Sequence, residues 1–198
     1  MNRINRITRP KNLGQLMAGL APVAPGNRDL TITGVTADSR QVRNGTLFVA
    51  VPGFVHDGHN FILDAIHNGA KAIVYQNPDY DAVQGTRVPT VQVTDSRQTL
   101  AVIADRFYDH PSGLLDLVAV TGTNGKTTVL SLLDAIFRAA GLKTGTIGTL
   151  GATILDSHVP GDRTTPDAVG LQSLLARMVT ADVTHAAMEI TSHALDLH

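Results

Sequence analysis

The sequence predicts an α/β protein with two domains: a small N-terminal α/β domain, then the first part of a second domain with a mainly parallel sheet. Short apolar strand patterns alternate with helix-period stripes along the 198 residues. The apolar run 117–120 breaks into a glycine-containing loop and then a helical pattern, which is typical of phosphate-binding loops. Pro111-Ser112-Gly113 interrupts the alternation. We therefore expect domains at 1–111 and 112–198.

The first half alternates strands and helices from its start. Asn12 is a candidate helix cap, Asn44-Gly45 gives a hairpin-type signal, and Asp95 with Gln98 forms a capping-box pattern. The expected elements are a short helix after Asn12, strands at 30–35 and 47–51, a helix closed by Gly69, strands at 72–75 and 90–93, and a helix from Asp95 to Phe107.

The second half continues the same alternation. After the strand at 117–120 and the loop, we expect a helix ended by Gly141, a strand at 144–150, a polar stretch at 156–163, a helix starting at Thr165-Pro166-Asp167 and a strand at 183–190. The first of these helices is expected to bury an apolar stripe made of Val129, Leu133, Ile136, Phe137 and Ala140. Parallel strands joined by helices place ligands at the strands' carboxyl ends.

Composition excludes several classes of protein. Hydrophobic residues make up 43% and charged residues 17%, a globular balance, and the net charge of −1 gives no electrostatic reason to bind nucleic acid or a membrane surface. The absence of cysteine excludes disulfides and thiol chemistry. A basic N-terminal tail is followed by no signal-peptide or membrane-spanning stretch, so a cytoplasmic protein is expected.

The loop after residue 120 carries phosphate-binding chemistry. Gly122 and Gly125 allow backbone N–H groups to turn around an anion at a helix N-terminus, Lys126 supplies a positive charge, and Thr127 places a hydroxyl for a nucleotide-bound magnesium. The general pattern asks for a glycine where Val120 stands, so the loop is a shorter variant. The alternative is an ordinary strand-turn-helix with a solvated lysine.

Glu189 is the only glutamate and lies at the end of an apolar strand. Burying it unpaired would be costly, and a magnesium ion shared with Thr127 would satisfy it; the alternative is an exposed carboxylate at a strand end. Zinc is not expected at His56 and His59, because no further ligands cluster with them. Ser192-His193 lacks the nucleophile elbow of a serine hydrolase.

The chain resembles the N-terminal part of a Mur ligase, of the MurE type, which adds an amino acid to UDP-N-acetylmuramoyl-L-alanyl-D-glutamate. The segments 38–50, Gly53, 57–59 and 69–70 follow a pattern shared with the MurF type. The segments that favour the MurE type are Gly122-Thr123-Asn124-Gly125-Lys126-Thr127-Thr128, Gly145-Thr146-Ile147-Gly148-Thr149, Thr164-Thr165-Pro166-Asp167 and Met188-Glu189-Ile190-Thr191-Ser192-His193-Ala194-Leu195. The family often has serine where Thr191 stands.

The resemblance implies a role for each of these segments. The first domain would bind the uridine end of the substrate, through Ser39 and the loop Phe54-Val55-His56. Thr164, Thr165 and Thr191 would contact the muramoyl-peptide part. Residues 122–128 would bind ATP, Thr127 and Glu189 would hold Mg²⁺, and Lys126 and Glu189 would be catalytic. ATP would convert the substrate carboxylate to an acyl phosphate, which an amine attacks to form the amide in peptidoglycan synthesis.

Other expectations concern the chain as it stands. It stops at His198, so the family's C-terminal amino-acid-binding domain, its modified lysine and a later histidine are expected to be missing, and this chain alone is expected to form no amide. The sequence leaves the added amino acid open between diaminopimelate and lysine. A monomer is expected. The alternatives are a non-catalytic nucleotide-sugar or ATP-binding module and, less favoured because no guanine-reading motif accompanies the loop, an ATPase or GTPase switch.

Overall fold

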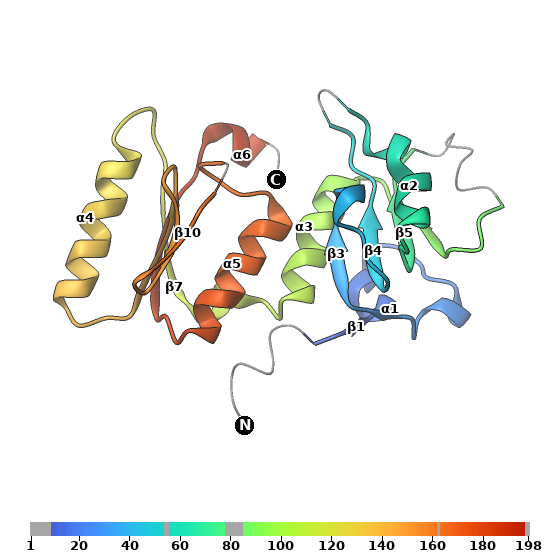
Figure 1. Ribbon diagram of the computed structural model, residues 1–198, viewed down its shortest axis with the longest axis horizontal. Coiled ribbons are helices and arrows are strands. Elements are labelled where there is room, and N and C mark those ends of the chain that lie inside the picture. The colour runs from blue at the N-terminus through green and yellow to red at the C-terminus, as the bar shows by residue number, and fades with distance from the viewer. Residues whose placement is uncertain (1–8, 54–55, 78–84, 162, 197–198) are drawn as a thin grey trace. The chain divides into compact units, whose positions relative to one another are not determined.

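The structure is a computed structural model that describes residues 9–53, 56–77, 85–161 and 163–196 (Figure 1). The chain divides into two compact units, which separate between Phe107 and Tyr108, close to the boundary predicted at residue 111. Each unit contains its own sheet. The described residues contain no helix that is both long and apolar enough to cross a membrane.

The first unit is built around a parallel four-stranded sheet in the order β3-β4-β5-β6. Its strands are β3 (Gly34–Thr36), β4 (Thr46–Val49), β5 (Ala72–Tyr75) and β6 (Thr90–Gln92). A separate antiparallel pair joins β1 (Lys11–Asn12) to β2 (Thr31–Ile32). The helices are α1 (Leu13–Met17), α2 (Ile62–His67) and α3 (Ser96–Phe107), with 3-10 turns at Pro25–Asn27, Ser39–Gln41 and Gly58–Phe61.

Figure 1 shows α2 and α3 on opposite sides of this sheet. Because successive strand residues point to opposite faces, Phe48 and Ala50 pack with Ile62 and Ala65 on the α2 side. Leu47 and Val49, fully buried, point to the other face. Both faces of the sheet are therefore covered, as a parallel sheet requires.

The second unit has a mixed five-stranded sheet in the order β10-β9-β8-β11-β7. Strands β7 (Asp116–Val120), β11 (His185–Glu189) and β8 (Thr144–Gly148) are parallel, and β9 (Gly151–Ile154) and β10 (Ser157–Val159) continue it as antiparallel strands. A 3-10 turn covers Pro111–Leu114, and the helices are α4 (Lys126–Ala139), α5 (Ala168–Thr180) and α6 (Ser192–Asp196).

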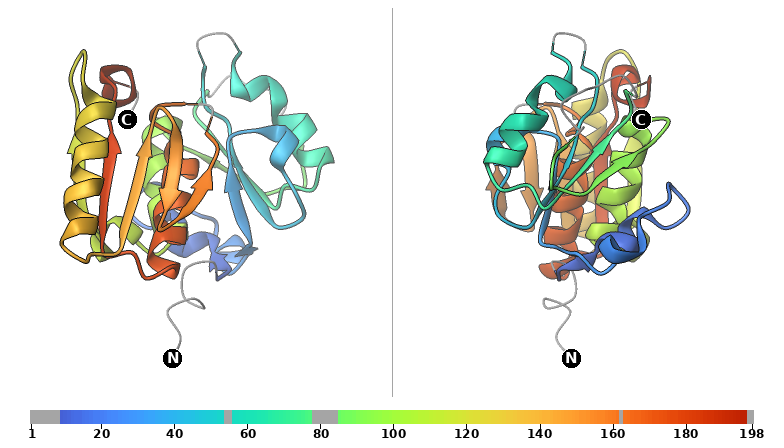
Figure 2. Two further views of the ribbon diagram at one scale, coloured as in Figure 1. Left: turned by 60° about the vertical axis from the view of Figure 1, so that its left-hand side comes forward. Right: turned by 90° about the vertical axis from the view of Figure 1, so that its right-hand side faces the viewer.

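The two faces of the second sheet are covered unequally. Helix α5 closes one face over a core that includes Ile147, Met178 and Met188. Helix α4 lies on the other face, where the left view of Figure 2 shows it running alongside β11. Among the described residues of α4, Leu130 alone is buried, whereas Ile136 is 62% exposed. The prediction that this helix buries an apolar stripe was therefore wrong over much of the helix.

Several predicted elements differ from the observed ones. The strand expected at 30–35 is two strands in different sheets, because β2 pairs with β1 and β3 pairs with β4. Asn44-Gly45 does not form a hairpin turn: the strands on either side of it are parallel. Gly45 instead takes φ +90°, and a Cβ there would collide with the Thr33 hydroxyl.

The stretch 144–163 was also predicted incompletely. The expected strand at 144–150 ends at Gly148 and is followed by a hairpin of β9 and β10, of which only β10 lies within the polar stretch expected at 156–163. Arg138 of α4 secures this hairpin, because its guanidinium donates to the Leu155 carbonyl and to the Asp156 carboxylate at 3.0 Å. Its further contact with Asp134, together with Asp156, raises the pKa of Arg138.

Candidate functional site

The predicted phosphate loop connects the end of β7 to the start of α4. Gly122 has φ +149° and Gly125, which caps α4, has φ +81°, so both use backbone conformations that favour glycine. Helix α4 is 14 residues long and presents its N-terminal N–H groups at this loop. Lys126 folds over the loop, where its ammonium donates to the Gly122 carbonyl at 2.7 Å.

The remaining predicted nucleotide-binding residues lie on or beside the same loop. Thr123 and Asn124 are exposed loop residues, and Thr128 is exposed on the first turn of α4. Thr127 differs from them because it is half-buried and points to the sheet, where its hydroxyl donates to Glu189 Oε1 at 3.0 Å. The loop thus has an open side made of backbone and Lys126 and an inner side made of Thr127.

Glu189 lies beside Thr127 on the inner side of the loop. Its residue exposure is 0%, so the exposed strand-end alternative was wrong. It ends β11 on the α4 face of the sheet, because strand alternation places Met188 in the core under α5. Oε1 also accepts the Thr149 backbone N–H at 3.1 Å, and Oε2 accepts the Thr149 hydroxyl at 3.0 Å. Three donors therefore satisfy the buried carboxylate.

The three threonines expected to contact substrate gather at the same end of β11. The Thr164 hydroxyl lies 3.1 Å from that of Thr149. The Thr165 hydroxyl donates to the Glu189 carbonyl and accepts the Thr191 N–H, each at 3.1 Å. Thr165 therefore ties the segment before α5 to residues 189–191 at the end of β11, and it does not cap α5. The carboxylate of Asp167 caps that helix, accepting the Gly170 N–H at 2.8 Å.

The Thr191 hydroxyl accepts the Ala194 N–H at 3.1 Å, at the start of α6. This bond leaves the hydroxyl hydrogen of Thr191 available to another acceptor. Ser192 and His193 lie within α6, a five-residue helix, and no nucleophile elbow is formed there.

A cleft of about 310 Å³ adjoins Glu189 between α4 and the strands β8 to β10. Its polar lining includes Thr127, Ser131, Asp134, His158 and Glu189. Gly148 borders it as well, and a Cβ at that position would collide with the Glu189 carboxylate. A residue without a side chain is therefore required where β8 passes the acid.

The oxygen atoms at Glu189 fit a magnesium ion. Mg²⁺ prefers oxygen ligands at about 2.0–2.1 Å, so neighbouring ligands of its octahedron lie about 3 Å apart. Thr127 Oγ1 and Glu189 Oε1 have this separation, at 3.0 Å. Within the described residues no three His, Cys, Asp or Glu side chains form a metal-binding group. Any magnesium there would rely on these two residues together with phosphate and water.

In the first unit, Ser39 lies in the 3-10 turn after β3 and is 8% exposed. Its carbonyl accepts the Asn68 side-chain amide at 3.0 Å. Of the loop expected to contact uridine, Phe54 and Val55 lie outside the described residues. His56 is exposed, with its ring edge-on to Phe61 at 6.4 Å between centroids. Ser39 and the loop follow the neighbouring strands β3 and β4.

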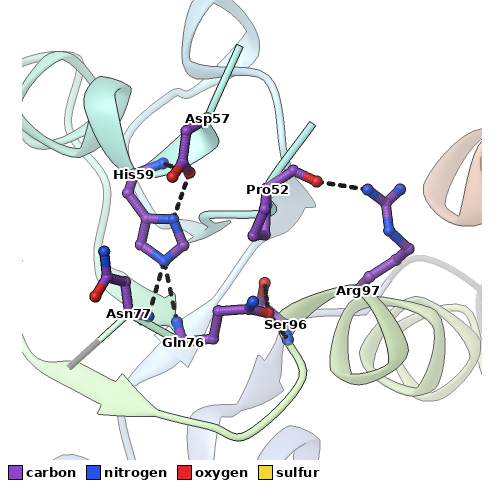
Figure 3. A network of polar contacts seen from close by, with 7 residues as sticks. All are labelled: Pro52, Asp57, His59, Gln76, Asn77, Ser96 and Arg97. Carbon is purple, nitrogen blue, oxygen red and sulfur yellow. Dashed lines mark hydrogen bonds and ion pairs between the residues drawn. The ribbon is translucent and has the colours of Figure 1, made fainter. Parts of the chain in front are cut away.

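His59 is buried, at 1% exposure, and has a structural role (Figure 3). Its Nε2 faces the backbone N–H groups of Gln76 at 3.1 Å and Asn77 at 3.2 Å. Because those groups only donate, Nε2 accepts and Nδ1 carries the hydrogen, which it donates to Asp57 at 2.5 Å. Burial raises the pKa of Asp57, but the hydrogen bonds from the His59 backbone and ring outweigh it, and the net pKa is lowered.

The same contacts continue around a circuit of loops. The Gln76 side chain accepts both the N–H and the hydroxyl of Ser96, at 2.8 and 3.0 Å. Next to Ser96, the Arg97 guanidinium donates to the Pro52 carbonyl at 2.5 Å, which returns to the loop that contains Asp57 (Figure 3). The loops after β4, β5 and β6 are thus joined at the carboxyl edge of the sheet, where ligands of parallel sheets bind.

Sequence reasoning missed Thr149 as a site residue, although it quoted the segment that contains it. The available signal was the expected parallel sheet with ligands at the carboxyl ends of its strands, because Thr149 lies near the end of the strand expected at 144–150. Only the structure shows that this strand pairs with that of Glu189. The missed residues Ser131, Asp134 and His158 had no such signal, because their approach depends on the unpredicted hairpin.

Fold and loop together define an α/β protein with a phosphate-loop architecture in its second unit. Residues 31–108 match the family model described as "Mur ligase family, catalytic domain", and residues 120–198 match "Mur ligase middle domain". The chain belongs to the Mur ligase family.

The relatives carry the name UDP-N-acetylmuramoyl-L-alanyl-D-glutamate–2,6-diaminopimelate ligase. The protein of that name from Cytophaga hutchinsonii is 46% identical over 170 residues, which are 85% of this chain and 35% of the relative. The one from Bacillus cereus is 45% identical over 177 residues, 89% of this chain and 35% of the relative. The chain therefore spans about a third of the length of these relatives.

Solved structures show the same similarity. The structure of a UDP-N-acetylmuramoyl-L-alanyl-D-glutamate–2,6-diaminopimelate ligase aligns with a TM-score of 0.79 at 27% identity, over 95% of this chain and 37% of its own. The MurF ligase from Thermotoga maritima, solved in complex with ADP, aligns with a TM-score of 0.51 at 26% identity, over 80% of this chain and 32% of its own. The second of these shows that a related fold binds an adenine nucleotide.

Proposed function

We propose that the chain is the N-terminal and middle part of an ATP-dependent ligase of peptidoglycan synthesis. Its substrate is UDP-N-acetylmuramoyl-L-alanyl-D-glutamate, and diaminopimelate is the amino acid added, because the similar curated proteins carry that activity in their names. The observation that supports a phosphoryl-transfer site is the buried Glu189 carboxylate bonded to Thr127 at the N-terminus of α4.

The reaction divides into two balanced steps. A carboxylate oxygen of the substrate attacks the γ-phosphorus of ATP, and the bond to the β-γ bridging oxygen breaks, which releases ADP and forms an acyl phosphate. The amine of the incoming amino acid then attacks the acyl carbon and loses a proton as phosphate leaves, and an amide remains.

Within the first step, the residues of the second unit have separate roles. The backbone N–H groups of the glycine loop and the N-terminus of α4 bind the phosphates, and Lys126 leaves the Gly122 carbonyl to contact the transferred group. Thr127 and Glu189 would hold Mg²⁺, which supplies neutralisation of the charge moving through the phosphoryl group. Thr164, Thr165 and Thr191 would contact the muramoyl-peptide part, which their gathering beside Thr149 and the end of β11 supports.

The first unit binds the uridine end in this proposal. Ser39 and His56 follow neighbouring strands at the carboxyl edge of the parallel sheet, and the hydrogen-bonded circuit around His59 orders the loops beside them. The chain is expected to act as a monomer in the cytoplasm.

A calorimetric titration of this chain tests the proposal. UDP-N-acetylmuramoyl-L-alanyl-D-glutamate and Mg-ATP should both bind, and GTP should bind more weakly than ATP. Ser39→Ala should weaken binding of the uridine nucleotide by up to about tenfold, the effect of one lost hydrogen bond, and leave ATP affinity unchanged. Equal losses for both ligands, or no binding of the uridine nucleotide by the unaltered chain, would contradict the proposal.

A further inference from the structure

We propose that Thr149 is a positioning residue that fixes the Glu189 carboxylate for a divalent cation and, through the same hydroxyl, makes Thr164 a hydrogen-bond acceptor toward the substrate. The inference rests on the proposed function, because it concerns the cation and the substrate of that site. It adds Thr149 to the site and assigns which hydroxyl donates in the pair Thr149 and Thr164.

The positions of the hydrogens follow from the contacts at Glu189. A carboxylate only accepts, so each hydroxyl beside it must donate. Thr149 has one hydroxyl hydrogen, and it points to Oε2 at 3.0 Å. The hydrogen of Thr127 points to Oε1 at 3.0 Å, so the lone pairs of Thr127 are not directed at the acid. Those lone pairs are what a cation would contact.

Thr149 holds the carboxylate by two of its own atoms. The backbone N–H contacts Oε1 at 3.1 Å while the hydroxyl contacts Oε2, so the plane of the carboxylate is fixed as well as its position. Gly148, immediately before Thr149, provides the room that this arrangement needs. Hydrogen bonds of this kind to a metal-binding carboxylate set its orientation and affect metal affinity.

The polarity of Thr164 follows from the same hydrogen. Its hydroxyl lies 3.1 Å from the Thr149 hydroxyl, whose hydrogen is already directed at Glu189. Thr164 must therefore donate to Thr149, and only its lone pairs remain for a ligand. The group that Thr164 recognises is a donor, such as an amide N–H or a hydroxyl of the muramoyl-peptide, and not a phosphate oxygen.

The first test measures cation binding by this chain, with Mn²⁺ as an EPR-detected probe in the presence of ADP. Thr149→Val should weaken Mn²⁺ affinity by about 10- to 100-fold, the range found for outer-shell partners of metal ligands. Thr149→Ser should restore most of the affinity. The affinity for ADP in EDTA should stay unchanged in both variants, which a general structural defect would not allow.

A matched control is Thr184→Val, which removes another exposed threonine hydroxyl at the opposite end of β11, bonded to the Lys143 carbonyl at 3.3 Å. It should leave Mn²⁺ affinity unchanged. Wild-type Mn²⁺ affinity in Thr149→Val would overturn the inference, as would equal losses of Mn²⁺ and metal-free ADP. If the unaltered chain itself does not bind Mn²⁺, the proposed function is wrong, and the inference about Thr149 is wrong with it.

The second test measures binding of UDP-N-acetylmuramoyl-L-alanyl-D-glutamate. Thr164→Val should weaken substrate binding and leave Mn²⁺ affinity unchanged, whereas Thr149→Val should weaken both. Because the two hydroxyls act in series on the substrate, the double variant should lose no more substrate affinity than the weaker-binding single variant. Fully additive losses would show that Thr149 does not act through Thr164.

Discussion

The carboxyl edges of the sheets in the two units are organised differently. In the first unit, three loops at the carboxyl edge of the sheet are joined to one another by the circuit through His59, Gln76 and Arg97. In the second unit, the ends of β7, β8 and β11 converge on one buried acid, Glu189, to which the Thr127 and Thr149 hydroxyls donate. The polar groups of the first edge bond to one another across loops, whereas those of the second edge gather around a single carboxylate, which is where we propose that the ligand binds.

Because of this difference, substitutions at the first edge should change the stability of the fold, and substitutions at the second edge should change ligand affinity. Removing a polar group from the circuit leaves backbone N–H groups without an acceptor, so the fold should lose stability. Removing a group from the phosphate loop leaves few internal contacts unmade, so the nucleotide should lose affinity while the fold changes little. The predictions that follow test this contrast, in order of decreasing effect.

The largest effect concerns how α4 is held in the second unit. Leu130→Ala should destabilise this unit by about 2–5 kcal/mol, because Leu130 is a buried contact between the helix and the sheet. Ile136→Ala on the exposed side should cost under about 0.5 kcal/mol. Hydrogen exchange of peptides from the second unit measures both. Similar losses in the two variants would show that the outer stripe is covered in solution.

In the first unit, His59→Leu should cost about 2–4 kcal/mol, because the Gln76 and Asn77 N–H groups lose their acceptor in a buried site. Their amide exchange should accelerate more than that of the sheet core. His67→Leu at the exposed end of α2 is the control and should change little. Unchanged exchange at Gln76 and Asn77 would show that the circuit does not hold the loops.

In the second unit, Lys126→Ala should weaken Mg-ATP binding by about 10- to 100-fold, the effect of a lost hydrogen bond between charged groups. The Lys126 ammonium bonds to the exposed loop at the Gly122 carbonyl, so the melting temperature should stay near that of the unaltered chain. Calorimetry and a thermal melt measure the two quantities. ATP affinity that survives the substitution would remove the support for a phosphate loop.

The smallest effect is a pH dependence in the first unit. The Arg40 side chain beside Asp38 lowers the pKa of that carboxyl, against the opposing effect of partial burial. Stability from this contact is present above the unfolded pKa of about 3.9 and is lost as pH falls through the lower folded pKa. Since Arg40 is largely exposed, the gain is small.

Asp38→Asn provides the measurement for this contact. The variant should be slightly less stable than the unaltered chain near neutral pH, and the two denaturation curves should converge in acid. A difference that persists unchanged at low pH would assign the effect to the capping bond from the Arg40 N–H to Asp38 and not to the charge.

Local patterns were sufficient for much of the candidate site. Glycines beside a lysine at a strand-to-helix junction indicated the loop, and an acid ending an apolar strand indicated Glu189. Both signals depend on residues that are neighbours in the chain, so periodicity and turn chemistry contain them. Thr149 lies near the end of the strand expected at 144–150, but only the structure shows that this strand pairs with the strand of Glu189.

What the sequence determined by itself is most of the series of strands and helices, the glycine loop before α4 and the acid that ends β11, because backbone preference and apolar spacing are local properties. The tertiary structure alone decided that residues 151–159 extend the sheet as a hairpin, that Leu130 and not Ile136 is buried, and that Thr165 joins two segments while Asp167 caps α5. The Thr165 bonds join residues 24 and 26 positions apart, and Leu130 is buried by strands distant in the chain, so neither leaves a local period in the sequence. The hairpin and the Asp167 cap join residues that are close in the chain, but β9 forms by pairing with β8, and Asp167 caps α5 where Thr165 is bonded elsewhere.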